Sequence, residues 1–138
     1  IGLGGQIESC YVYDVGIYCY LDKYYLYAGG IAGKPANVIN SGVRTFLVDG
    51  NVFSSGGIVG SAAGSRRYNA MGEELPGYYG GNIQGCMSID ARIKSEYAAG
   101  GIVGEATTPA QNAVISNCYA FDSLLKAGTY NKEIDKCE

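Results

Sequence analysis

Histidine and tryptophan are both missing from this chain of 138 residues, and charged residues make up only 17% of it. Without histidine, the chain cannot form the Ser-His and Cys-His pairs that activate nucleophiles in many hydrolases. None of its five cysteines belongs to a C-x-x-C motif, so the spacing typical of zinc sites is also lacking. We therefore expect no catalytic residue, no bound metal and no cofactor, and we predict that the chain is not an enzyme.

Long apolar runs and clusters of basic residues are lacking as well. No segment approaches the roughly 20 apolar residues that a transmembrane helix needs, so we expect no insertion into a membrane. The ten Lys and Arg residues form no stripe and the net charge is −3, which disfavours nucleic acid as a partner. The first five residues resemble the end of a repeat described below, so we expect the chain to be a segment of a longer protein.

One short pattern occurs in several copies: Ile-x-x-Cys, then an aromatic residue or Met, any residue, an apolar residue and Asp. Copies begin at Ile7, Ile83 and Ile115, and a degraded copy begins near Ile39, with Gly42 in place of the cysteine. A second pattern, Gly-Gly-Ile followed by Ala or Val and Gly, occupies 29–33, 56–60 and 100–104. Repeats of this length indicate a stack in which no unit buries its apolar face alone. We predict one elongated domain, 1–138, built of about four repeats.

The repeats have the composition of strands and turns, because β-branched and aromatic residues alternate with Gly, Asn, Asp and Ser. Alternation places Cys10 and Val12 on one face of a strand and Tyr11 and Tyr13 on the other. The first face carries small side chains in the three copies that have the cysteine, as the narrow core of stacked coils requires. We predict an all-β chain folded as a parallel β-solenoid, with the glycine pattern taking positive φ at the corners. The polar segment 61–79 is predicted to be an inserted loop.

These motifs resemble the GLUG repeat of bacterial surface proteins, in which Gly-Gly-Leu/Ile-Val-Gly precedes Ile-x-Asn-Cys-Tyr-Ala. The match is strict at 100–122 and looser over most of the rest, with departures at Ser9, Gly42 and Gly85. The resemblance implies a right-handed parallel β-helix (a β-solenoid) in a secreted or cell-surface protein. It implies no catalytic residue.

The cysteines fall into two groups. Cys10, Cys86 and Cys118 occupy equivalent repeat positions and are predicted to stack as a ladder of buried free thiols. Cys19 and Cys137 lie outside the ladder, near the two ends of the chain, and are the better candidates for a disulfide within or between chains.

The outward positions of the repeat are also apolar, which is unusual for a sheet exposed to water. The sequence has 13 tyrosines, and it assigns Val43 and Thr45 to the outward positions of the second copy. The candidate partner face comprises Tyr11, Tyr13, Met87, Ile89, Tyr119 and Phe121. Such a face is either covered by an inserted loop such as 61–79 or meets another subunit, a host glycoprotein or a glycan.

The preferred hypothesis is therefore a non-catalytic structural or adhesive β-solenoid module, extracellular or at the cell surface. One alternative is a self-assembling extracellular filament subunit, because terminal coils leave unpaired strand edges that favour association end to end. A second alternative is a β-helix that binds or cleaves polysaccharide. Asp14, Asp90 and Asp122 are equivalent positions that could hold calcium, although aspartate at a strand end is also ordinary turn chemistry, and the second copy has Phe46 there.

Overall fold

The computed structural model of the protein describes residues 5–20, 26–34, 37–62, 65–79, 81–106 and 114–128, and every regular element within these ranges is a β-strand. Coil 1 contains β1 (Gln6–Glu8), β2 (Tyr11–Cys19) and β3 (Tyr27–Gly29). Coil 2 contains β4 (Asn37–Ile39), β5 (Gly42–Gly50), β6 (Ser54–Gly56) and β7 (Val59–Ser61). Coil 3 contains β10 (Ile83–Gln84), β11 (Met87–Ser95), β12 (Ala98–Gly100) and β13 (Val103–Glu105). Coil 4 contains β14 (Ile115–Ser116), β15 (Tyr119–Phe121) and β16 (Leu124–Ala127).

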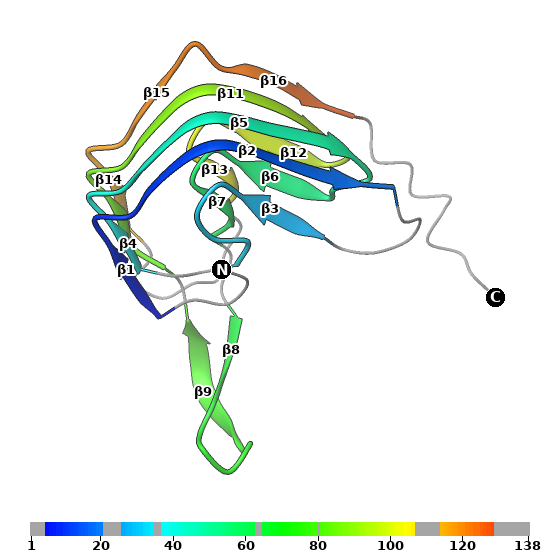
Figure 1. Cartoon of the computed structure of the whole chain (residues 1–138). Coiled ribbons are helices and arrows are strands. Elements are labelled where there is room, and N and C mark those ends of the chain that lie inside the picture. The colour runs from blue at the N-terminus through cyan, green and yellow to red at the C-terminus, as the bar shows by residue number, and fades with distance from the viewer. Residues whose placement is uncertain are drawn as a thin grey trace, which may run out of the picture.

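Equivalent strands of successive coils pair in parallel and form four sheets that wrap around one core (Figure 1). The first sheet has the order β1-β4-β10-β14, and the second has the order β2-β5-β11-β15 with β16 also on β11. The third sheet is β3-β6-β12, and the fourth is β7-β13, extended by a bridge from Ala32 to Val59. This arrangement confirms the predicted parallel β-solenoid of about four coils.

The register corrects the alignment of the second copy by one residue. Ile7 pairs with Val38, and Tyr11 pairs with Gly42, so the second copy begins at Val38 rather than Ile39. The position equivalent to the cysteines is then Ser41, and Gly42 takes the outward position that Tyr11 has in coil 1. Because side chains alternate between the faces of a strand, this shift exchanges inward and outward residues throughout the copy.

Two columns of residues with positive φ shape each coil. The first column lies in the corner before the second sheet and consists of Ser9, Asn40, Gly85 and Asn117. The second lies within β2, β5 and β11 and, in coil 4, between β15 and β16; it consists of Asp14, Thr45, Asp90 and Asp122. Asn, Asp and Gly adopt this left-handed conformation more readily than other residues, which explains their recurrence at these positions. In β2 and β5, the positive-φ residue and the residue before it are both exposed, so the alternation of inward and outward side chains is interrupted, as it is at a β-bulge. The strands arch at this point (Figure 1).

The glycine pattern has a different role from the predicted one. No glycine of the three patterns has a positive φ among the described residues. Instead, a side chain would not fit at Gly29, Gly30, Gly56, Gly57, Gly60, Gly100, Gly101 and Gly104. A Cβ on Gly30 would lie 2.7 Å from Cγ2 of Val43, and a Cβ on Gly101 would lie 2.5 Å from Cβ of Ala120. Gly30 and Gly101 therefore each pack against an inward side chain of the following coil. The interior is narrow because the backbone at these positions occupies part of it.

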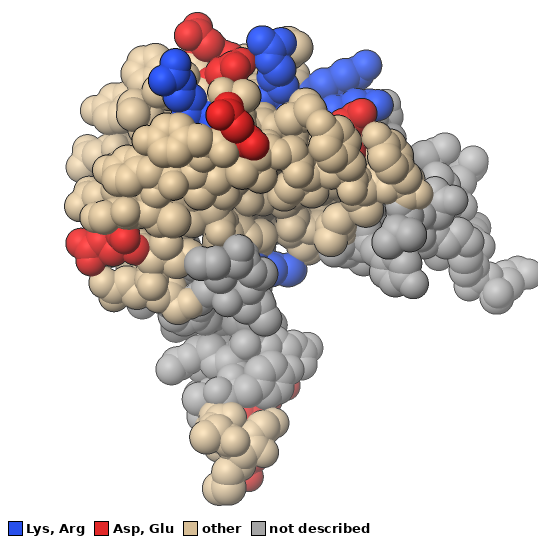
Figure 2. Space-filling model, in the orientation of Figure 1, with Lys and Arg blue, Asp and Glu red and all other residues tan. Residues whose placement is uncertain are grey.

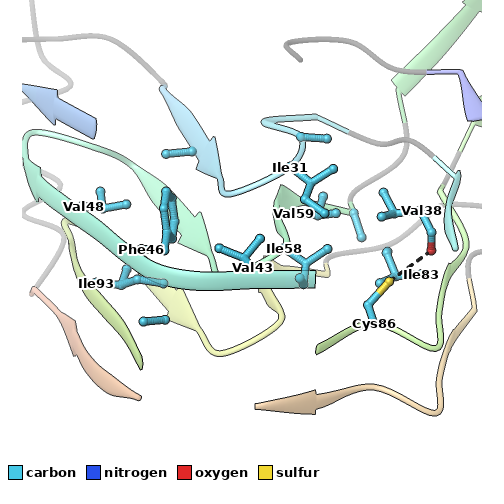
Figure 3. Packing of buried hydrophobic residues seen from close by; sticks show 14 of the residues in the cluster. Ile31, Val38, Val43, Phe46, Val48, Ile58, Val59, Ile83, Cys86 and Ile93 are labelled. Carbon is cyan, nitrogen blue, oxygen red and sulfur yellow. Dashed lines mark hydrogen bonds between the residues drawn. The ribbon is translucent and has the colours of Figure 1, made fainter. Parts of the chain in front are cut away.

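The core is one cluster of buried apolar side chains that runs through the stack (Figure 3). Val38 and Ile83 stack between adjacent coils, and Ile31 and Ile58 of the glycine pattern face them from the opposite side. Phe46 and Val48 of β5, together with Ile93 of β11, fill the other half of the cross-section. Burial is greatest in coils 2 and 3, because only these coils have a described neighbour on both sides.

The segment between coils 2 and 3 is a hairpin, which corrects the prediction of a loop over 61–79. Ser61 still belongs to β7, and β8 (Ser65–Tyr68) pairs antiparallel with β9 (Glu74–Tyr79). The turn is held by Asn69, whose side-chain oxygen accepts hydrogen bonds from the backbone N–H groups of Met71 and Glu73. The hairpin projects away from the solenoid, on the side opposite the arched second sheet (Figure 1).

Candidate functional site

The outer face of the second sheet gathers all six residues of the candidate partner face. Strand pairing places them in two adjacent columns, one running Tyr11-Gly42-Met87-Tyr119 and the other running Tyr13-Arg44-Ile89-Phe121. The prediction that Val43 and Thr45 point outward in the second copy was wrong in part. Val43 is buried inside the coil, Thr45 belongs to the positive-φ column, and Gly42 and Arg44 occupy the outward positions. The error follows from the one-residue shift in the alignment.

Most of these side chains are open to solvent. Tyr11, Tyr13 and Tyr119 are each about 60% exposed (59%, 63% and 59%), Phe121 is half exposed, and Ile89 is partly buried. The inserted segment does not cover them, because the β8–β9 hairpin leaves the solenoid on the opposite side. The sequence offered two explanations for an apolar outer face: coverage by an inserted loop, or contact with a partner. Coverage by an inserted loop is therefore wrong for the hairpin.

Glycines let two of the tyrosine rings lie along the sheet. A Cβ on Gly42 would come within 3.0 Å of Cδ1 of Tyr11, so the ring of Tyr11 lies over Gly42 in the next strand. Similarly, a Cβ on Gly16 would lie 2.8 Å from Cε2 of Tyr18. A ring lying along the sheet can present its face, rather than only its edge, to a ligand. Sequence reasoning missed Gly42, Gly16 and Tyr18, although the alternation of glycine with tyrosine in Gly16-Ile17-Tyr18 was a usable signal.

At the other end of the face, Tyr119 and Phe121 form a stacked pair. Their ring centroids are 6.3 Å apart and the ring planes differ by 14°. Charged residues continue the sheet beyond the aromatic columns: Lys94 Nζ lies 3.5 Å from Asp49 Oδ1, and Arg92 Nε lies 3.2 Å from Asp90 Oδ1. Both pairs are well exposed and add little to stability. Lys, Arg, Asp and Glu gather along the top of the molecule in Figure 2, and other residues form most of the surface below.

The aspartate column has a structural explanation in this fold. Asp14, Asp90 and Asp122 all adopt φ near +50°, and the fourth member is Thr45, not Phe46 as the sequence alignment suggested. Their recurrence is accounted for by the backbone conformation that the arch of each long strand requires. Among the described residues, no three His, Cys, Asp or Glu side chains converge in a way that could hold a metal ion.

The cysteine column points inward, with Ser41 as its fourth member. Cys86 is fully buried, whereas Cys10 and Cys118, in the end coils, are partly exposed. The Cys86 thiol donates to the carbonyl oxygens of Val38 (3.4 Å) and Gln84 (3.3 Å). Cys118 donates in the same way to Ser116, and the Ser41 hydroxyl donates to Ile39. All four members of the column are therefore small, and three of them donate a hydrogen bond to the carbonyl two residues before them.

The other two cysteines were the disulfide candidates. Cys19, at the end of β2, is a partly buried free thiol, and Cys137 lies outside the described residues. The pairing of Cys19 with Cys137 stays a prediction.

Alkylation should distinguish the three column cysteines. Burial raises the pKa of the Cys86 thiol, so Cys86 should react with iodoacetamide far more slowly than Cys10 and Cys118 in the folded protein. Because the pKa of this thiol is higher in the folded state, its contribution to stability is fully present below the pKa that it has in the unfolded chain. That contribution is lost as the pH rises through the pKa of the folded state. Mass spectrometry of peptides after timed labelling measures the rates. Equal labelling of all three cysteines would contradict the stacking register.

A second aromatic cluster, not anticipated from the sequence, lies where the third sheet begins. Phe53 and Tyr97 stack with ring centroids 4.7 Å apart and planes 4° from parallel, and Tyr27 packs edge-on to Phe53 at 5.8 Å. Lys34 Nζ lies 3.7 Å from the centroid of the Tyr27 ring. Burial lowers the pKa of Lys34, while the nearby charge of Glu105 opposes that shift. An aromatic residue three positions before Gly56 and Gly100 was the signal in the sequence.

Comparison with family models, curated proteins and solved structures found no match to this chain. The part of the chain that the structure describes contains no helix of the length and hydrophobicity that crossing a membrane requires.

Proposed function

We propose that this chain is a non-catalytic structural and adhesive module of a bacterial secreted or surface protein, and that it presents the outer face of its second sheet to a glycan or glycoprotein. The main support is the arrangement of Tyr11, Tyr13, Met87, Tyr119 and Phe121. They lie in two adjacent columns, and each is at least two-fifths exposed. Sugar rings pack their C–H faces against aromatic rings, and rings that lie along a sheet suit that contact.

The rigidity of the scaffold also supports a binding role. Parallel pairing to β5 and β11 fixes the strand positions, so little conformational entropy is lost when a partner binds. Arg44, between Tyr13 and Ile89, adds a fixed donor that can bind hydroxyl or carboxylate oxygens of a sugar. The bacterial and surface-exposed parts of the proposal rest on the GLUG-like motifs, together with the low charge and high tyrosine content of the sequence.

Binding to immobilised polysaccharides and glycoproteins tests the proposal. In a panel of such ligands, at least one should retain the native chain, and Tyr11→Ser combined with Tyr13→Ser should weaken that binding by about tenfold or more. Both side chains are exposed, so the melting temperature should change little. Tyr20→Ser is the matched control, because Tyr20 is 69% exposed but lies beyond the end of β2, outside the two columns.

Two outcomes would contradict the proposal: retention by no ligand in the panel, or binding by the double variant that equals that of the native chain. Calcium-dependent cleavage of a bound polysaccharide that is lost in Asp90→Asn would instead favour the alternative of a polysaccharide-cleaving β-helix.

A further inference from the structure

Two of the three cysteines in the inward column are direct neighbours. The strand register is the same on both sides of the corner between the first and second sheets, and it sets Cys86 of coil 3 beside Cys118 of coil 4. Both are free thiols in the structure. Cys10 of coil 1 is separated from Cys86 by Ser41 of coil 2. Cys86 and Cys118 are therefore the one adjacent pair of thiols in the described part of this column.

We propose that Cys86 and Cys118 form a site of reversible oxidation, at which a peroxide converts the two thiols into a disulfide that joins coils 3 and 4. In this reaction both S–H bonds break and one S–S bond forms. The two protons and two electrons that leave the thiols pass to one molecule of hydrogen peroxide, whose O–O bond breaks to give two molecules of water. A dithiol reductant reverses the reaction and is itself oxidised to a disulfide.

The spacing of the two positions suits a disulfide. Adjacent strands of a parallel sheet lie about 4.8 Å apart, which is within the Cα–Cα range of about 4.4–6.8 Å that a disulfide spans. The Cys118 thiol donates to the carbonyl oxygen of Ile83 in coil 3 at 3.4 Å, as well as to that of Ser116 in its own coil at 3.2 Å. Its sulfur atom therefore lies on the side of its coil that faces Cys86.

The two side chains already interact in the reduced protein. Burial is the main cause of the raised pKa of Cys86, and the neighbouring Cys118 thiol adds to it through its charge and a side-chain hydrogen bond. Both cysteines lie between strands, each directly after a positive-φ residue, Gly85 or Asn117. Rotation about the Cα–Cβ bonds can therefore bring the sulfur atoms together without moving either strand.

The disulfide lies beside the candidate partner face. Met87 and Tyr119 follow the two cysteines directly in the sequence and pair with each other in the first of the two outward columns. Oxidation therefore ties two adjacent strands together at the edge of that face, and reduction releases them. The inference is independent of the glycan-binding proposal, because it concerns the inward face of the coils and needs no ligand.

Peptide mapping after mild oxidation tests the pairing. A chain carrying Cys19→Ser and Cys137→Ser keeps only the three thiols of the column. The folded chain is treated with hydrogen peroxide, unfolded in the presence of N-ethylmaleimide and digested with trypsin without reductant. Mass spectrometry should then find peptides joined between Cys86 and Cys118, and dithiothreitol should separate them. Peptides joined through Cys10 should amount to less than about a tenth of this product, because Cys10 and Cys86 lie two coils, or about 10 Å, apart. The native chain should give the same joined peptides.

Cys118→Ser, added to the same chain, is the matched control. Ser41 keeps the remaining thiols of Cys10 and Cys86 apart, so this variant should form no intramolecular disulfide under the same conditions. A further Ser41→Cys substitution should restore one, because position 41 has a thiol neighbour in the coil on each side. Circular dichroism should show that all variants remain folded.

Three results would overturn the proposal. The first is an oxidised, folded chain in which Cys86 and Cys118 are not joined, and the second is a comparable amount of product joined through Cys10. The third is an intramolecular disulfide in the Cys118→Ser variant, because pairing would then not depend on adjacent positions in the column.

Discussion

Replacing Gly57 by alanine should lower the free energy of unfolding by about 3 kcal/mol or more, or prevent folding altogether. A Cβ at this position would overlap the backbone carbonyl oxygen of Gly101 and the side chain of Ser88 in the next coil. Backbone on one side and a buried strand on the other leave little room for relaxation. Urea denaturation followed by far-ultraviolet circular dichroism measures the change.

The control is Gly5→Ala, because Gly5 is exposed and an added Cβ there meets no atom within 4 Å. This substitution should change stability by no more than a few tenths of a kcal/mol. If Gly57→Ala proved as stable as Gly5→Ala, the coils could not be packed backbone against side chain in the way described.

Replacing Cys86 by arginine should have a comparable effect, with a loss of about 4 kcal/mol or more. Cys86 is 0% exposed and lies between Ser41 and Cys118 in the inward column, so a guanidinium group there has neither water nor an anion to pair with. Cys86→Ser should cost only about 1 kcal/mol, because Ser41 already occupies this column in coil 2 and its hydroxyl donates the equivalent hydrogen bond.

The same arginine substitution at Cys118 should be much milder, at about 1 kcal/mol, because this residue is partly exposed at the end of the stack. The sequence alone shows the three ladder cysteines as equivalent, and on that basis predicts a severe effect for Cys118→Arg as well. Thermal unfolding of the two arginine variants separates these expectations. Equal losses of stability at the two positions would mean that Cys118 is as fully covered in solution as Cys86, against the burial described.

Much of the architecture followed from the sequence alone because stacked coils repeat their chemical requirements. The recurrence of Ile, Cys and Asp at fixed spacing marks positions that face the same environment in every coil, and parallel stacking is the way in which repeats without helices can share a core. The candidate partner face was also predictable, since alternation in a strand assigns Tyr11 and Tyr13 to the face opposite Cys10 and Val12.

Only the tertiary structure decided the register of the second copy. By their chemistry, either Val38 or Ile39 could begin the second copy. Both choices fit the sequence pattern equally well, but a shift of one residue reverses which side chains are buried. The strand pairing settles the choice, because Val38 is fully buried beside Ile83. The role of the glycines was likewise hidden from the sequence, which shows where a residue is small but not whether space or backbone conformation requires it.

Position in the stack was the other property that the sequence did not contain. Ile83 and Ile115 are identical in their motifs, yet one is fully buried and the other is 46% exposed, because burial depends on having a coil on each side. The course of the inserted segment was decided in the same way, by the hairpin that β8 and β9 form with each other and not by packing on the solenoid. The sequence therefore determined the repeating unit and its inward and outward chemistry, whereas three-dimensional neighbours determined which copies of that chemistry are buried and which are exposed.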